Sequence, residues 1–511
     1  MNRKLQKECE SSTEYLLPDY MGDIKKLLSS KARAVSTGKF VGEGNVEVSG
    51  SVEYDLLYVD AEGKLTAVNA SSDFNENFAV DTEVYIDSAE ESRVCDLKVR
   101  VTGPRKISLK ADVHTSLTVS EENELHIAGD VFSEEGKTVE KCTTDVVFAS
   151  SVFAKSGERE YAEIAEKFEG ITSEEIEVVY ANGTTCVKEV LTGDGEVTVK
   201  GENIVSAILA IQERPPVKIK KSIPFEEVIA VEGAKPEMTA IGSGFVSSAD
   251  IGFGIDEGEG LSAVANIIAE YNVELIENES ATVVTDAYTV ECDSQNKYAE
   301  AQFLKSVYAG TRTFCVDVKA DKREEKLDTL CDVISMEGEI RTVTGNLTKG
   351  GCDFNGEIAV IGVGYETNVD GSVTYIPIKI QGGFDEKVNL DLQLDDKNQL
   401  EYIMSIGDCE VINDAETLTV RCTVSVRVYL TFPENVRMLV SCESIEGEKK
   451  IRDASVITVY YPRNGERLFD VAKKYRTTSA KIANDNSLTE SALASFDSPD
   501  SLVGIKKLII R

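Results

Sequence analysis

The chain has 511 residues, with 54 Lys and Arg against 90 Asp and Glu, which gives a formal net charge of −36 at pH 7. Such a charge disfavours nucleic acid and anionic membrane surfaces as partners, because both are bound through clustered cations. A protein with a basic or mixed face is the favoured partner. The length predicts three or four domains, and a hydrophobic content of 42% can build packed cores.

The N-terminal segment mixes charged residues throughout and lacks the apolar stretch of a secretion signal. No apolar run of about eighteen residues is present, so we expect no transmembrane helix and no direct membrane insertion. The 11 cysteines are scattered and contain no CxxC pair. This pattern is typical of reduced thiols in a cytosol and disfavours a disulfide framework.

An internal repeat dominates the chain before the last sixty or so residues, where alternating apolar and polar residues predict strands. Three strand runs contain a glycine at comparable places, Gly50, Gly201 and Gly356, with separations of 151 and 155 residues. Each run is followed by an extended segment containing a phenylalanine, at Phe74, Phe225 and Phe384. A later strand run recurs with anchors at Leu109, Leu261 and Leu418. Nearly constant spacing of three anchors predicts a domain-sized unit present three times.

We therefore predict a mainly β fold with three sandwich- or barrel-like domains, at residues 1–150, 151–310 and 311–452. Short helical patterns at Leu16–Leu28, Tyr161–Phe168 and Lys326–Val333 predict minor helices within them. A small α+β domain with the order strand, helix, helix, strand is predicted at 457–511.

The tail resembles a LysM domain. Gly465-Glu466-Arg467-Leu468 stands where that family has Gly-Asp-Thr-Leu, and Ala472-Lys473-Lys474-Tyr475 continues the first helix. Asn486 and the segment Val503–Leu508 correspond to the family's closing motif, with Val in place of Pro. LysM domains are binding modules, so the resemblance implies that the chain ends in a part that holds a partner.

The three β-rich units followed by such a tail resemble the spore-coat-associated SPOCS family, through the glycine strand starts and the Phe74 and Phe225 segments. The resemblance implies a non-enzymatic scaffold in sporulation, first in the mother-cell cytoplasm and then on the forespore surface. It implies as partners a spore coat morphogenetic ATPase (SpoIVA-like) and other coat proteins.

The LysM resemblance also implies a groove between the loop before the first helix and the loop before the second strand. We predict that the partner binds there, at Gly465, Glu466, Arg467, Leu468, Phe469, Asn486, Leu502 and Gly504. Leu468 fits core packing better than contact. Phe469 is offset by about 100° on a helix and is the better surface candidate.

Peptidoglycan is the alternative ligand of this groove, which would recognise its N-acetylglucosamine units. Three features favour a protein instead. Glu466 and Arg467 replace the family's shorter polar residues, the segment between Asn486 and Leu502 is acidic, and no export signal is found. A third possibility is self-assembly of the β units through open strand edges.

No enzyme is expected from this sequence. Only two histidines occur, His114 and His126, and neither stands near a second catalytic or metal-ligand type. Gly136-Lys137-Thr138 ends like a phosphate loop, but Val131 occupies the place of the required earlier glycine. We expect no catalytic residues, no metal and no cofactor.

Overall fold

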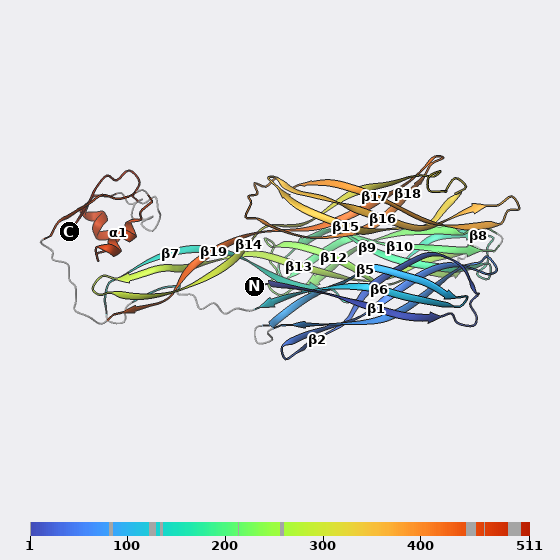
Figure 1. Ribbon diagram of the computed structural model, residues 1–511, viewed down its shortest axis with the longest axis horizontal. Helices are drawn as coiled ribbons and strands as arrows, with labels where there is room; N and C mark the ends of the chain where they lie inside the picture. Colours follow the sequence, from blue (N-terminus) through green and yellow to red (C-terminus); the bar gives the residue numbers. More distant parts are fainter. Residues whose placement is uncertain are drawn as a thin grey trace.

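The structure is a computed structural model, and it describes residues 2–80, 85–121, 129–132, 136–212, 214–255, 260–445, 456–463, 465–488 and 502–511. Strands dominate it (Figure 1), so the predicted mainly β class is confirmed. Three β units follow one another along the chain and a small C-terminal module ends it. Each unit pairs two antiparallel sheets in the same way.

Unit 1 contains two three-stranded sheets, of order β1-β6-β5 and β2-β3-β4. Its strands are β1 (Asn2–Leu16), β2 (Ile24–Gly42), β3 (Asn45–Asp60), β4 (Leu65–Ala79), β5 (Tyr85–Gly103) and β6 (Lys106–Glu121). Unit 2 repeats the pattern as β11-β10-β9 and β12-β13-β7, with β8 also paired to β13. Its strands are β7 (Val139–Lys155), β8 (Arg159–Glu169), β9 (Ile176–Thr192), β10 (Glu196–Ile211), β11 (Val217–Ala230), β12 (Thr239–Ile255) and β13 (Gly260–Thr289).

Unit 3 has the sheets β14-β19-β18 and β15-β16-β17. Its strands are β14 (Ser294–Asp321), β15 (Asp332–Thr348), β16 (Gly351–Thr367), β17 (Val373–Asn389), β18 (Gln399–Asn413) and β19 (Thr417–Ser444). The C-terminal module consists of β20 (Thr458–Tyr460), α1 (Leu468–Lys474), α2 (Ser479–Asp485) and β21 (Leu508–Ile510).

Two details of the sequence-based fold are wrong. The boundaries placed after residues 150 and 310 fall inside strands β7 and β14. The helices predicted within the units are also absent: Tyr161–Phe168 is part of β8, Leu16–Leu28 joins β1 to β2 through turns, and Lys326–Val333 is a turn region that leads into β15. Pairing with a neighbouring strand decides these short segments, since their helical periodicity spans only two or three turns.

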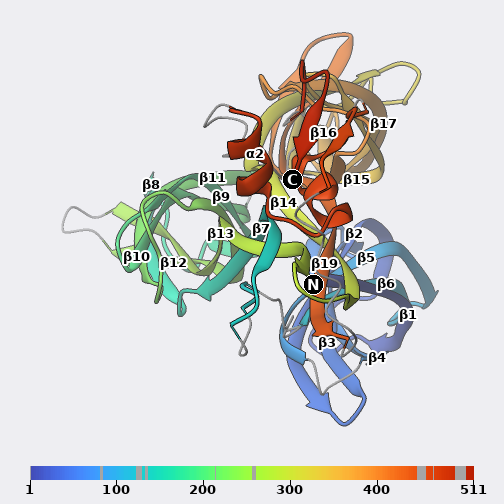
Figure 2. The same cartoon turned by 90° about the vertical axis from the view of Figure 1, so that its left-hand side faces the viewer.

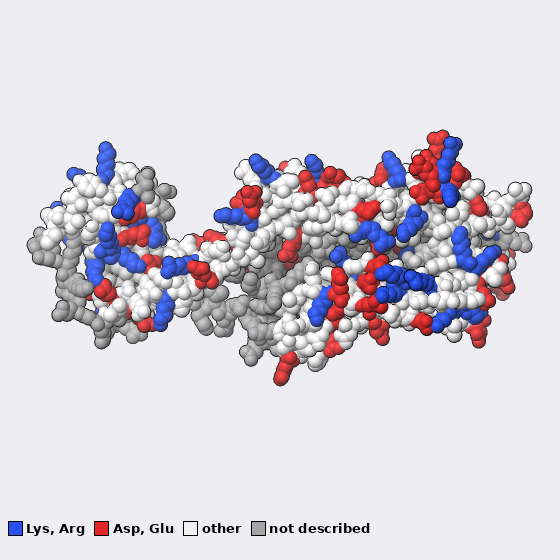
Figure 3. Space-filling view, in the orientation of Figure 1, with Lys and Arg blue, Asp and Glu red and all other residues white. Residues whose placement is uncertain are grey.

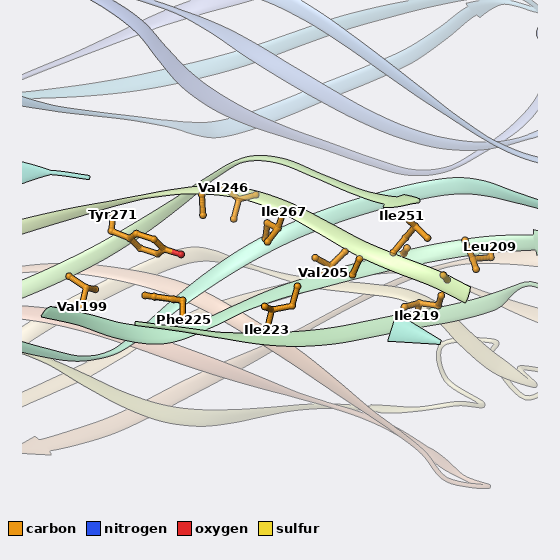
Figure 4. Packing of buried hydrophobic residues seen from close by; sticks show 14 of the residues in the cluster. Val199, Val205, Leu209, Ile219, Ile223, Phe225, Val246, Ile251, Ile267 and Tyr271 are labelled. Atoms are coloured by element: carbon orange, nitrogen blue, oxygen red, sulfur yellow. The ribbon is translucent and has the colours of Figure 1, made fainter. Parts of the chain in front are cut away.

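The core of each unit lies between its two sheets. Figure 4 shows this in unit 2, where side chains from β10 and β11 face those of β12 and β13. The Phe225 and Tyr271 rings stack with centroids 4.2 Å apart. Such interdigitation of two inner faces is the usual construction of a β-sandwich core.

The glycines that mark the sequence repeat lie directly opposite its phenylalanines. Gly50 pairs with Phe74, Gly201 with Phe225, and Gly356 with Phe384. A Cβ on any of the three glycines would approach a backbone carbonyl oxygen of the strand on the other side, at 2.1–2.4 Å, and the phenylalanine ring at 2.4–3.0 Å. Each glycine therefore gives room both to a ring and to a neighbouring backbone.

A β-bulge accompanies each of these glycines. The register shifts between Ser36 and Gly38 in unit 1, between Lys200 and Gly201 in unit 2, and between Ile340 and Thr342 in unit 3. Bulges bend a strand and increase its local twist. Each unit thus combines a glycine, a phenylalanine and a bulge, and together these curve the same sheet in every unit.

The three units pack around a common axis (Figure 2). Leu57, Ile208 and Val363 each follow the repeat glycine by seven residues, and they belong to one buried apolar cluster at this axis. One layer away, Lys31, Asn182 and Glu337 also occupy equivalent positions, since each pairs with the residue five after the repeat glycine. Glu337 accepts a hydrogen bond from Asn182 at 3.2 Å and forms an ion pair with Lys31.

Four long strands continue beyond units 2 and 3 and form a stalk, made of residues 139–150 of β7, 277–289 of β13, 294–306 of β14 and 431–444 of β19 (Figure 1). Val146, Val283, Val436 and Met438 pack between its two ribbons. The stalk leads to the C-terminal module.

We expect Gly50→Ala to lower the free energy of unfolding by about 1–3 kcal/mol, because the new methyl group would lie 2.4 Å from the Val35 carbonyl oxygen. Gly38→Ala, in the same sheet, is the control, since its Cβ would meet nothing within 4 Å. Urea denaturation of both variants measures the difference. Equal stability of the two variants would contradict the proposed role of the glycine.

Candidate functional site: the C-terminal module and its seat

The C-terminal module has a small core of its own, and its order of strand, helix, helix and strand is the predicted one. β20 pairs antiparallel with β21, and α1 and α2 pack on this ribbon. α2 begins at a conventional cap, where the Thr478 hydroxyl accepts a hydrogen bond from the Lys481 amide at 3.1 Å. The buried residues of the module are Leu468, Phe469, Val471, Ala472, Ile482, Ala483, Leu502, Leu508 and Ile510.

The module is seated on the end of the stalk through an aromatic contact. Tyr288 of β13 meets Phe469 of α1 edge-on, with ring centroids 5.2 Å apart. The Tyr288 hydroxyl donates a hydrogen bond to the Thr477 carbonyl oxygen at 2.8 Å. Burial raises the pKa of Tyr288, so this phenol stays a neutral donor. Tyr288 and Cys142 of the stalk belong to the same apolar cluster as the module's core.

Complementary charges surround this aromatic contact. Lys473 of α1 forms an ion pair with Asp286 at 2.5 Å, and Arg476 pairs with Asp293. The amide of Ser479, at the start of α2, donates to the Glu140 carboxylate at 3.3 Å. Figure 3 shows Lys and Arg side chains over the module beside acidic side chains at the stalk. Basic side chains of α1 and of the turn after it therefore face acidic side chains of the stalk.

The structure places the predicted groove residues in three different environments. Gly465 and Gly504 lie in exposed turns at positive φ, 77° and 82°. Glu466 accepts hydrogen bonds from the Tyr460 hydroxyl at 2.6 Å and from the Arg463 amide at 3.0 Å. The first of these bonds is the main reason why the pKa of Tyr460 rises to about 12. Glu466 thus fixes the loop that precedes α1.

Arg467 is held by its own helix. Its guanidinium binds the Asp470 carboxylate through two hydrogen bonds, at 2.9 and 2.8 Å. This bidentate pair raises the pKa of Arg467. A third guanidinium nitrogen lies 3.7 Å from the Cys142 Sγ of the stalk. Arg467 therefore contributes to α1 and its seat.

The expectation that Phe469 is exposed is wrong. Phe469 and Leu468 are both 0% exposed, and Leu502 is 5% exposed. If α1 packed only on the β20–β21 ribbon, Phe469 would be exposed to solvent. The stalk packs against the other side of α1 and buries this ring. Asn486 is structural as well: its amide donates to the Ile482 and Ile509 carbonyls at 2.8 and 2.6 Å, which ties α2 to β21.

Sequence reasoning missed two features. Tyr461 and Val503 are 69% and 72% exposed, on the two loops that the LysM resemblance assigns to the groove. The alternation of Val459 and Tyr461 indicates that these two side chains share one face of the run that enters the first loop, and both are exposed. The seat on Tyr288 and Asp286 had no comparable indication, since it joins segments almost two hundred residues apart.

The described part of the chain contains no cluster of side chains of the kind that holds a metal ion. There, no three His, Cys, Asp or Glu side chains gather as a metal site would require. His114 lies in β6 with Glu8 and Arg93 as its strand neighbours, and His126 lies outside the described residues. None of the described helices is long and apolar enough to cross a membrane.

Comparison with known proteins gives one family. Residues 23–103 and 176–252 match the family model described as SipL, SPOCS domain. The two segments are equivalent parts of the repeat, since they correspond to β2–β5 in unit 1 and β9–β12 in unit 2. No curated protein and no solved structure matches the chain significantly.

We expect Lys473→Glu to loosen the module from the stalk, because it replaces the ion pair with Asp286 by repulsion. Backbone amides of α1 should then exchange with deuterium about tenfold faster, which corresponds to a loss of about 1.4 kcal/mol. Lys481→Glu is the matched control, on exposed α2 surface. Unchanged exchange in Lys473→Glu would contradict a seated module.

Proposed function

We propose that the protein is a non-enzymatic scaffold of spore coat assembly, because two of its segments match the family model described as SipL, SPOCS domain. In this proposal the LysM-like C-terminal module binds a coat-assembling ATPase. The three units help to hold the coat at the forespore surface, which the protein reaches from the mother-cell cytoplasm. The SPOCS match is the observation that carries the sporulation role.

The shape of the molecule supports a scaffold. The module stands at the far end of a four-stranded stalk, while the three units form one body at the other end (Figure 1). A partner of the module can therefore approach without meeting the units.

The surface that we assign to the partner differs from the one that the sequence indicated. Phe469 and Leu468 are buried, and Arg467 is bound to Asp470. Tyr461 and Val503 remain as exposed apolar side chains on the two groove loops. Tyrosine is among the residues that most often carry binding energy at interfaces. We therefore place the contact at these two loops.

Peptidoglycan is the second candidate ligand of the module, and it shares the same two loops. The engagement of Glu466 with Tyr460 and the Arg463 amide disfavours it, because these groups would otherwise be available to sugar hydroxyls and N-acetyl groups. The protein partner is therefore the first choice.

A paired binding assay tests the proposal. The full chain and a chain ending at residue 445 are tested against a purified coat-assembling ATPase and, separately, against purified peptidoglycan. We expect the full chain to bind the ATPase and the shortened chain to lose at least tenfold in affinity. Binding of the full chain to peptidoglycan alone would replace the proposal by the second candidate.

Tyr461→Ala combined with Val503→Ala should weaken ATPase binding about tenfold or more, because two exposed apolar contacts are removed. Tyr20→Ala is the control, since Tyr20 is 84% exposed on unit 1. Titration by surface plasmon resonance measures both variants. Equal affinity in the two would exclude the groove loops as the contact.

A further inference from the structure

Units 2 and 3 border a partly open cavity of about 110 Å³ at their boundary. Its walls come from β9, β10 and β11 of unit 2 and from β15 and β18 of unit 3. Lys218, Lys220 and Asp408 line it, and the Lys220–Asp408 ion pair across the boundary is 2.5 Å long and partly exposed. A single water needs only about 10–15 Å³ by the same measure. The cavity therefore admits small polar molecules and excludes large ones.

One cysteine of a close pair forms part of this wall. Cys409 lines the cavity and is 9% exposed, while Cys422 behind it is 0% exposed. The two residues are direct partners across β18 and β19, and their sulfur atoms are 3.5 Å apart. Gly338 makes room for them, since a Cβ there would lie 3.2 and 3.3 Å from the two sulfurs.

The backbone beside Cys409 is irregular. The register of β18 against β19 shifts between Ile406 and Cys409, so that Gly407 and Asp408 have no partner in the ladder. A bulge leaves residues of one strand without ladder partners and bends that strand. Cys409 directly follows these unpaired residues, so the bulge separates the cysteine pair from the regular ladder before it.

We propose that Cys409 and Cys422 form an oxidation site, in which a small peroxide enters the cavity and converts the two thiols into a disulfide. The Cys409 sulfur attacks one peroxide oxygen, the O–O bond breaks, and the thiol proton leaves with the second oxygen as water. This step yields a sulfenic acid on Cys409. Cys422 then attacks the Cys409 sulfur, the S–O bond breaks, and water leaves. In total, two thiols lose two electrons and two protons, and hydrogen peroxide becomes two molecules of water.

Oxidation at this site would also affect how units 2 and 3 pack against each other. Asp408 is the bulge residue next to Cys409, and it forms an ion pair with Lys220 of unit 2. A disulfide at the next residue fixes the bulge and, with it, the position of this ion pair. Oxidation would therefore fasten β18 at the boundary of units 2 and 3.

The test treats the full-length protein with hydrogen peroxide or, in parallel, with glutathione disulfide, which is too large for the cavity. Free thiols are then alkylated under denaturing conditions, and unreduced tryptic peptides are analysed by mass spectrometry. We expect a Cys409–Cys422 link at least tenfold faster with peroxide at equal concentration. Exposed Cys95, in contrast, should react with both oxidants.

Two cysteine variants sharpen the result. In Cys422→Ser, oxidation should stop at a Cys409 sulfenic acid that dimedone traps. In Cys331→Ser, which removes an exposed thiol outside the pair, the link should form as in the unchanged protein. Absence of the link while Cys95 is oxidised would overturn the proposal. Equal rates with peroxide and glutathione disulfide would overturn the role of the cavity.

Discussion

The close approach of backbones at three glycines is the constraint on which the rest of this structure depends. At Gly50, Gly201 and Gly356 a carbonyl oxygen of the neighbouring strand occupies the space of a missing side chain, and a phenylalanine from the other neighbour fills the remainder. The adjoining bulge then bends the sheet. Because the bend recurs at the same register, each unit presents the same face to the axis, and three similar sheets can meet there.

Similar backbones at the axis carry different side chains. Lys31, Asn182 and Glu337 are equivalent by register, yet one is basic, one neutral and one acidic. Three identical charges at this place would repel one another, whereas this set forms an ion pair and a hydrogen bond. Burial raises the pKa of neighbouring Asp55, an effect that Lys31 and Arg33 reduce. The divergence of the repeats is therefore part of what makes their packing stable and unique.

The sequence predicted best those features that depend on residues of the same unit. The glycine and phenylalanine spacing predicted a tripled β unit, and the structure pairs these residues face to face. Tyr161–Phe168 was misassigned because a short segment suits either a helix or an edge strand, and only the presence of β13 decides. Phe469 was misplaced for a similar reason. Its environment depends on Tyr288, which is remote in sequence.

In the described part of the chain, only units 2 and 3 lengthen their strands into the stalk. Residues 277–289 of β13 extend for roughly 40 Å at about 3.3 Å per residue. A single-chain linker of that length would fold back on itself much of the time, but here every strand is paired along its course. The stalk consequently keeps the C-terminal module at a fixed distance from the three units. A molecule bound by the module would therefore be held away from anything that the units bind.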